Sequence, residues 1–140
     1  VAQNLAKAID ADLAEIVPVP PFTAQETDWT DPTSRASRQH ADRAMRPPIS
    51  ASPSADGYDE IFVGYPLWWD TAPREVRTWL ESHDFTGKTI TTFATSSSST
   101  RGALGEQLHD SAPDAHWVNG RRFAANASEA ELKTWADSIA

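Results

Sequence analysis

The chain has 140 residues and a net charge of −8, contains no cysteine, and is 39% hydrophobic. This length predicts one domain, residues 1–140, with a single core, and the lack of thiols excludes disulfides, cysteine nucleophiles and cysteine-bound zinc. The acidic balance disfavours a nucleic-acid surface, and the sequence shows no apolar run of membrane-spanning length and no signal-peptide pattern. We therefore expect a cytoplasmic protein with no nucleic-acid partner and no membrane partner.

The first predicted elements are a helix and a short strand. Residues 1–9 have the apolar spacing of an amphipathic helix that packs on a sheet. The stretch 13–19, LAEIVPV, predicts a strand, which Pro18 and Pro20 restrict to the edge of the sheet because proline donates no ladder hydrogen bond. A helix that leads to such a strand is half of a βαβ unit.

Residues 20–57 are predicted to be a proline-rich insertion, because they are polar and lack sustained periodicity. One or two helical turns are expected near 34–45. The insertion is either an anion clamp or partner surface, or a solvated excursion that pairs its own charges, which is the commoner fate of surface charge runs. Trp29 is expected to anchor it to the domain. Its acidic half, followed by its basic half, is Glu26, Asp28, Asp31, Arg35, Arg38, Arg43 and Arg46.

The central stretch is YDEIFVGYPLWWDTAP, residues 58–73. Ile61–Val63 is a continuous apolar run, typical of a strand buried on both faces of a parallel sheet. A helix is predicted to begin near Asp70, with Pro73 in its first turn. Trp68 and Trp69 lie between strand and helix, and two adjacent indoles in a loop cannot both enter one core. At least one should face a ligand, a partner or solvent. The apolar stripe of the predicted helix is Val76, Trp79 and Leu80.

The remaining elements continue the alternation of strands and helices. Residues 89–95, TITTFAT, predict a β-branched strand, and Ala103, Leu104 and Leu108 mark a helix after it. Residues 115–123 predict the last strand, with Gly120 as a bulge or bend, before a final helix capped by Ser128 and Glu131. This order indicates an α/β fold with a parallel sheet and helices on both faces.

Two predicted loops, residues 65–71 and 95–100, leave the carboxyl ends of successive strands. Right-handed crossovers would place them side by side, where open α/β folds bind ligands. One loop offers indole faces and the other offers hydroxyl groups and close backbone N–H donors, which together suit a planar heteroaromatic ring with polar edges. Each loop alone has a plainer explanation. One indole could belong to the core while the other covers a hydrophobic edge, and the serines could form a flexible polar turn.

Other chemical signatures are weaker. The histidines lack metal-ligand spacing, so no metal site is expected. The sequence contains no G-x-S-x-G elbow, which disfavours a serine hydrolase. Arg121 and Arg122 near the end of the last strand could meet a phosphate, although an exposed pair is more often only solvated.

Three stretches together resemble the flavodoxin-like family, in particular its stand-alone bacterial members: YDEIFVGYPLWWDTAP, WLESHDFTGKTITTFATSSSSTRG and DAHWVNGRRFAANASEAEL. The resemblance covers nearly the whole chain, including the insertion. It implies a three-layer α/β/α fold whose parallel sheet, in the strand order 2-1-3-4-5, binds FMN at the switch point. It also implies the cofactor-binding residues, which are Pro66, Leu67, Trp68, Trp69, Asp70, Thr95, Ser96, Ser97 and Ser98.

The resemblance implies that loop 66–70 covers the isoalloxazine, that loop 95–98 contacts its other side and polar edge, and that the electron chemistry belongs to the flavin. The chain departs from the family pattern at Asp70, where glycine is usual, and in the second loop, where serines replace glycines. The carboxylate of Asp70 should disfavour an anionic reduced flavin.

The first strand and the phosphate loop of the family precede the helix that here starts at Val1. The resemblance therefore implies an N-terminally truncated chain from which the first, central strand of the sheet is absent. A missing central strand would leave backbone groups unpaired, so we expect a homo-oligomer or another association that completes the sheet.

Two functions follow from the resemblance. The first is an FMN-binding redox protein, as an FMN-dependent oxidoreductase that passes electrons or a hydride to an unidentified redox partner, with a quinone as one candidate. The alternative is an interaction scaffold, not an enzyme, that binds no flavin in this form. The sequence leaves the choice open.

Overall fold

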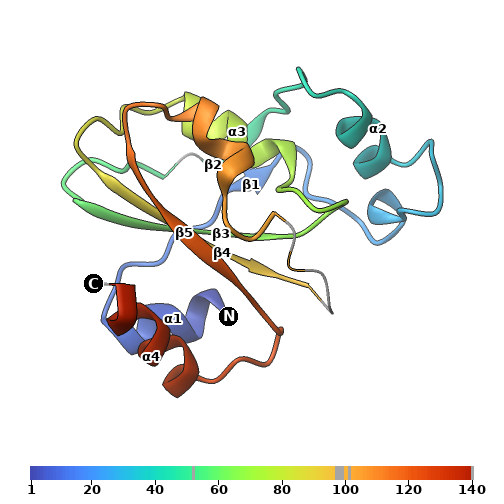
Figure 1. Ribbon diagram of the computed structural model, residues 1–140. Helices are drawn as coiled ribbons and strands as arrows, with labels where there is room; N and C mark the ends of the chain where they lie inside the picture. Colours follow the sequence, from blue (N-terminus) through green and yellow to red (C-terminus); the bar gives the residue numbers. More distant parts are fainter. Residues whose placement is uncertain (52, 97–99, 101, 140) are drawn as a thin grey trace.

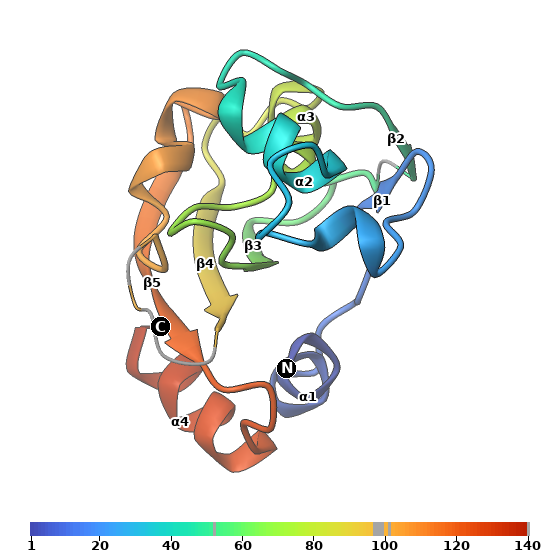
Figure 2. The same ribbon diagram turned by 90° about the vertical axis from the view of Figure 1, so that its right-hand side faces the viewer.

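The computed structural model describes residues 1–51, 53–96, 100 and 102–139, and these form three layers (Figures 1 and 2). The middle layer is a parallel sheet of β3 (Glu60–Pro66), β4 (Thr89–Thr95) and β5 (His116–Phe123), in that order. One face is covered by α1 (Ala2–Ile9) and α4 (Glu129–Ile139), and the other by α3 (Arg74–Glu81) with the 3₁₀ helix η2 (Glu106–Ser111). The expected α/β class and flavodoxin-like layering are confirmed.

The core under α3 follows the helical spacing read from the sequence. The predicted stripe of Val76, Trp79 and Leu80 is buried, and it packs on Val63 and Ile90 of the sheet. Each such aliphatic side chain stabilises the fold by about 1.5–3 kcal/mol relative to exposure. Removing the stripe would therefore detach α3 and the loop that leads into it.

The core on the opposite face joins the two ends of the chain. Leu5 of α1 and Leu132 of α4 are buried with Phe93 and Phe123 of the sheet. The ring of Trp135 meets Phe123 edge-on, with centroids 5.0 Å apart. As expected, α4 is capped by Ser128, whose Oγ accepts a hydrogen bond from the Glu131 backbone N–H at 3.1 Å. These contacts fix the sheet from below.

A bulge in β5 brings the loop after β4 close to the sheet. The β4–β5 register shifts between Thr91 and Phe93, where β5 contains one more residue than β4. A Cβ on Gly120 would stand 2.0 Å from the Thr92 Oγ1 in β4 and 2.4 Å from the Ala103 carbonyl oxygen in the following loop, so only glycine allows this approach. The predicted bulge at Gly120 is confirmed.

Three expectations for the framework were wrong or only partly right. Within 13–19, only β1 (Val17–Pro18) is a strand, and it pairs antiparallel with β2 (Ile49–Ala51) rather than joining the parallel sheet. The helix after β4 is the short η2, because Gly105 at φ 82° interrupts the apolar run before it. Ile61–Val63 is not sealed on both faces: Ile61 is half-buried, since β3 is an edge strand of the described parallel sheet.

The insertion packs on the rest of the domain and is not only a solvated excursion. Its helix α2 (Arg35–Ala41) begins at Ser34, whose Oγ accepts a hydrogen bond from the Ser37 N–H at 3.2 Å. Arg74, at the start of α3, donates to the backbone carbonyl of His40 at 2.8 Å and so ties α2 to α3. The charges pair internally only in part, as in the Arg35–Glu26 contact at 3.6 Å.

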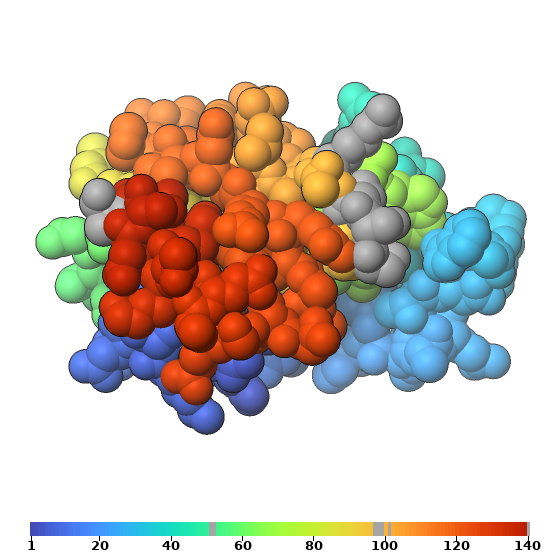
Figure 3. Space-filling view, turned by 60° about the horizontal axis from the view of Figure 1, so that its bottom comes forward, coloured from blue at the N-terminus to red at the C-terminus, as the bar shows by residue number. Residues whose placement is uncertain are grey.

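Trp29 does not anchor the insertion, which corrects the expectation from the sequence. Its side chain is 73% exposed. It follows the short 3₁₀ helix η1 (Gln25–Thr27), and the light-blue part of the insertion stands out from the body of the molecule in Figure 3. The aromatic anchors of the insertion lie elsewhere, at the loop that follows β3.

Candidate functional site

The loops that follow β3 and β4 lie side by side, as the crossover argument predicted. The backbone N–H of Leu67 donates to the carbonyl of Thr95 at 3.0 Å, which extends the β3–β4 ladder into the loops. Farther out, Gly102 approaches Asp70 so closely that a Cβ at Gly102 would lie 2.0 Å from the Asp70 carbonyl oxygen. The two segments therefore form one continuous surface at the carboxyl edge of the sheet.

The paired tryptophans stand in a tight turn with a strained backbone. Trp68 and Thr71 exchange two backbone hydrogen bonds of 2.9 and 3.1 Å, and the two residues between them have positive φ, 50° at Trp69 and 63° at Asp70. Positive φ at both central positions defines a type I′ turn, which favours Asn-Gly over Trp-Asp. A left-handed conformation costs about 1–2 kcal/mol at a residue with a Cβ. The surrounding structure must hold this turn, as is common at functional loops.

A hydrogen-bonded buttress holds the turn from behind. The carbonyl of Gly102 accepts hydrogen bonds from the Tyr65 hydroxyl at 2.6 Å and the Gln107 Nε2 at 3.1 Å. Burial raises the pKa of Tyr65, so its hydroxyl remains a proton donor at neutral and moderately alkaline pH. With Gly102 fixed, the Asp70 carbonyl packed against it is fixed as well.

Both indoles contact aromatic rings that come from the insertion. Trp69 is 38% exposed, and the His40 imidazole stacks on it with ring centroids 4.6 Å apart and planes tilted by 13°. Trp68 is half-buried and meets the edge of Phe22 at 5.2 Å. The expectation that at least one indole faces outward is confirmed for Trp69. No sequence pattern predicted Phe22 and His40 at this position, because contacts between segments that are far apart in the chain leave no periodic pattern.

The imidazole of His40 is neutral in this setting. Burial, followed by the nearby charges of Arg74 and Arg43, lowers its pKa. A neutral imidazole can stack on an indole without the cost of removing a charge from water. The stack is therefore favoured at neutral pH and weakened when acid protonates His40.

The serine loop is fixed at its start by the last strand. Arg122 of β5 donates from Nε to the Ser96 carbonyl at 3.1 Å and to the Ser96 Oγ at 3.2 Å. Arg121 points to the other face and pairs with Glu131 at 3.6 Å. The alternation of side chains along a strand is the signal that could have separated these two arginines. Ser97 and Ser98 lie outside the described residues.

Two buried polar side chains lie behind the Trp68 turn without hydrogen-bond partners among the described residues. They are the Glu75 carboxyl, 3% exposed, and the Gln39 Oε1. Burial raises the pKa of Glu75, which favours the neutral acid. The adjoining cavity, lined in part by Gln39, Trp68 and Arg74, measures about 10 Å³ and is no larger than one water. This cavity is therefore too small to hold a flat ring.

The arrangement suits a planar ligand more than a metal ion. The described residues contain no group of His, Asp and Glu placed to hold a metal ion. None of the described helices could cross a membrane. An exposed indole beside a fixed backbone edge can instead stack on a ring and hydrogen-bond to its rim.

The fold and these loops define an α/β protein of the flavodoxin-like class. The chain belongs to the flavodoxin family, whose model, described as Flavodoxin, matches residues 1–139. A proposed flavoprotein from Bacteroides uniformis is 37% identical, with a TM-score of 0.88, over 96% of this chain and 86% of that one. Another, from Bacteroides eggerthii, is 38% identical, with a TM-score of 0.88, over 98% of this chain and 86% of that one. A search of curated proteins found no match.

The structure gathers the described residues that the resemblance assigned to the cofactor. Those at the carboxyl edge of β3 and β4 are Pro66, Leu67, Trp68, Trp69, Asp70, Thr95 and Ser96. Their role in binding FMN stays a prediction. The residues that sequence reasoning missed are Phe22, His40, Tyr65 and Gly102, which position these loops. Arg122 was considered only as a phosphate contact, and in the structure it holds Ser96.

Proposed function

We propose that the protein binds FMN and transfers electrons or a hydride between a reductant and an unidentified acceptor, with a quinone as one candidate. The observation that carries this proposal is the outward indole of Trp69, presented on a strained turn that follows the hydrogen bond from the Leu67 N–H to the Thr95 carbonyl. Membership of the flavodoxin family and the proposed flavoprotein relatives support it.

The residues present fit such a ring. Trp69 offers an exposed aromatic surface, whereas the cavity beside Trp68 is too small to hold the ring. When bound, FMN supplies the electron chemistry. Arg122 holds Ser96 in place, and the carboxylate of Asp70 adds negative charge that disfavours an anionic reduced ring.

The test compares FMN binding to Trp69→Ala with binding to Trp29→Ala. Both variants lose one exposed indole, but Trp29 lies on the protruding part of the insertion. If Trp69 stacks on the ring, its removal should weaken FMN binding by about 1–3 kcal/mol, measured by quenching of flavin fluorescence. Trp29→Ala should bind like the parent. If the parent and both variants bind FMN with equal affinity, Trp69 does not stack on the ring.

A non-enzymatic scaffold is the second candidate, and the His40 stack favours it. The ring that contacts Trp69 in this structure comes from the chain itself, as it would in a protein that binds no flavin. Colourless, folded protein that quenches no added FMN would support the scaffold. Protein that carries absorbance near ~450 nm would exclude it.

We also propose that another strand completes the sheet at β3. Within the described residues β3 pairs only with β4, so one of its edges is open. Open edges of this kind favour pairing with another strand. In sedimentation experiments the 140-residue chain should form a dimer or another strand-completing assembly, whereas a folded, flavin-saturated monomer would contradict this.

A further inference from the structure

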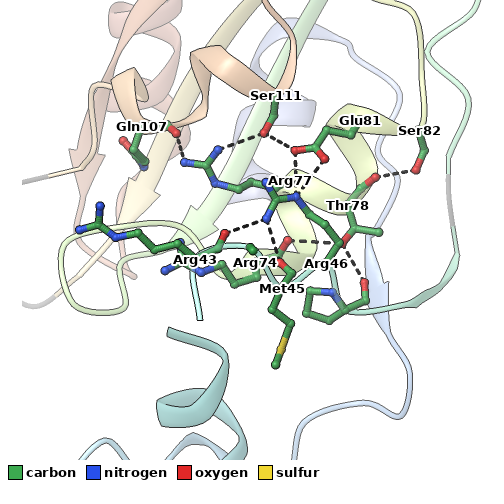
Figure 4. Close-up of polar contacts among 12 residues, drawn as sticks. Arg43, Met45, Arg46, Arg74, Arg77, Thr78, Glu81, Ser82, Gln107 and Ser111 are labelled. Atoms are coloured by element: carbon green, nitrogen blue, oxygen red, sulfur yellow. Dashed lines mark hydrogen bonds and ion pairs between the residues drawn. The ribbon is translucent and has the colours of Figure 1, made fainter. Parts of the chain in front are cut away.

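Arg77 and Glu81 fasten the short helix η2 to α3. These two residues are four apart on α3, so their side chains lie on the same face of the helix. Arg77 donates hydrogen bonds to the Ser111 Oγ at 3.1 Å and to the Gln107 carbonyl (Figure 4). The Ser111 hydroxyl in turn donates to the Glu81 Oε2 at 2.8 Å. Because Gln107 and Ser111 both belong to η2, this face of α3 holds η2 at two points.

A second row of polar side chains on α3 holds the insertion. Arg74 donates to the His40 carbonyl at 2.8 Å, and the Thr78 Oγ1 donates to the Pro47 carbonyl at 2.8 Å. The His40 imidazole stacks on the indole of Trp69. One of the two supports of the Trp69 turn is therefore anchored on α3 through the insertion.

The other support of this turn is anchored on α3 through η2. The Gln107 side chain donates from Nε2 to the Gly102 carbonyl at 3.1 Å, the same carbonyl that accepts from the Tyr65 hydroxyl. Gly102 packs directly against the Asp70 carbonyl of the turn. Since Arg77 holds the backbone carbonyl of Gln107, the amide reaches Gly102 from a fixed point.

The orientation of η2 depends on directional contacts of this kind. A 3₁₀ helix has poorer hydrogen-bond geometry than an α-helix, and the N-cap of η2 is Gly105, which has no side chain to cap it. Leu108 is 1% exposed and buries η2 in the core, but apolar burial is not directional. The two hydrogen bonds from Arg77, to Gln107 and to Ser111, can fix the rotation of η2 about this core contact.

We propose that Arg77 is a positioning residue for the turn at residues 68–71, which it holds through η2 and Gln107. Arginine suits this role, because its planar fork donates to two acceptors in a fixed geometry. The consequence for ligand binding rests on the proposed function, in which Trp69 stacks on the ring. An indole that is already held in place loses less conformational freedom when a ring binds to it.

The test follows the ¹⁹F NMR signal of Trp69 in protein labelled with 5-fluorotryptophan, assigned by its absence in Trp69→Phe. Arg77→Gln should shift this signal, and so should Gln107→Met, which removes the amide but keeps the backbone carbonyl that Arg77 contacts. The double variant should shift no further than the larger single change, because both residues act along one route. An unmoved signal in Arg77→Gln, or shifts that add in the double variant, would overturn the proposal.

Arg46→Gln is the matched control for a general loss of stability. It removes the same charge and two hydrogen bonds of 2.9 Å from the Arg46 Nε to Glu81, but it leaves both bonds from Arg77 to η2 intact. The Trp69 signal should stay in place in this variant, with circular dichroism confirming that all variants are folded. Equal shifts in Arg46→Gln and Arg77→Gln would assign the effect to lost stability and overturn the positioning role.

A titration with FMN separates this inference from the proposed function. Arg77→Gln should bind FMN about fivefold more weakly than the parent, the equivalent of one hydrogen bond, and Arg46→Gln should bind it like the parent. Equal FMN affinity in the parent and Arg77→Gln would overturn the effect of Arg77 on the ring site. If none of the proteins binds FMN, the proposed function fails, while the ¹⁹F shifts, recorded without flavin, still decide whether Arg77 positions the turn.

Discussion

The buttress at Gly102 makes a quantitative prediction. In Gly102→Ala the new Cβ would lie 2.0 Å from the Asp70 carbonyl oxygen, whereas Cβ atoms in proteins essentially never come closer than 3.0 Å, so the loops must separate by about 1 Å. The φ of 82° adds about 1–2 kcal/mol of left-handed strain. Separation also weakens the hydrogen bonds that Tyr65 and Gln107 donate to this carbonyl, each worth about 1 kcal/mol. We expect a total loss of about 3–4 kcal/mol in the free energy of unfolding.

Gly87→Ala is the matched control for this prediction. Gly87 has nearly the same φ, 77°, but a Cβ there would meet nothing within 4 Å. It should lose only the strain, about 1–2 kcal/mol, in urea titrations followed by circular dichroism. The difference between the two variants measures the contact between the loops. If Gly102→Ala costs no more than Gly87→Ala, the loops are not braced as described.

Three further predictions concern the surroundings of the turn. Glu75→Gln should stabilise the fold, because the raised pKa of Glu75 means that the parent loses stability as pH rises above 4.5, the ordinary Glu value. Urea titrations should show that the variant gains about 1–2 kcal/mol in the free energy of unfolding at pH 8 and little at pH 4. A gain independent of pH would contradict a buried acid at this position. His40→Ala should cost about 1 kcal/mol in the free energy of unfolding and increase the quenching of Trp69 fluorescence by acrylamide, while His40→Phe should restore protection from quenching. Since the pKa of His40 is lowered, the parent should lose this protection as pH falls below 6.5. Unchanged quenching would refute the stack. Asp70→Gly should gain about 0.5–1 kcal/mol in the same titrations, because the backbone entropy that glycine loses on folding partly offsets the strain relieved at a φ of 63°. A loss would show that the Asp70 side chain stabilises the turn.

The parts of this fold that could be predicted are those that repeat with a period. Helical spacing identified the buried face of α3, and the alternation of strands and helices predicted a parallel sheet with helices on both faces. The same logic placed the loops after β3 and β4 side by side. Gly120 was recognisable because a glycine inside a strand commonly marks a bulge.

The parts that failed depend on contacts between distant segments. Trp29 was expected to be an anchor because of its size, but the rings that hold the insertion are Phe22 and His40, which no local pattern distinguishes. The strand expected at 13–19 shrank to β1, because its antiparallel partner β2 lies inside the segment assigned to an insertion. The residues that contact the two tryptophans therefore lie in the insertion, the stretch of sequence with the least regular pattern.

The way in which the Trp69 turn is supported limits how it could be transplanted. The His40 imidazole stacks on its indole ring and Gly102 packs against its Asp70 carbonyl, and each of these residues is about thirty residues away along the chain. A protein designer who copied only the short hairpin into a new host would leave two disfavoured residues without their clamps. Such a graft should relax, and the module that has to be moved includes the insertion helix and the glycine as well.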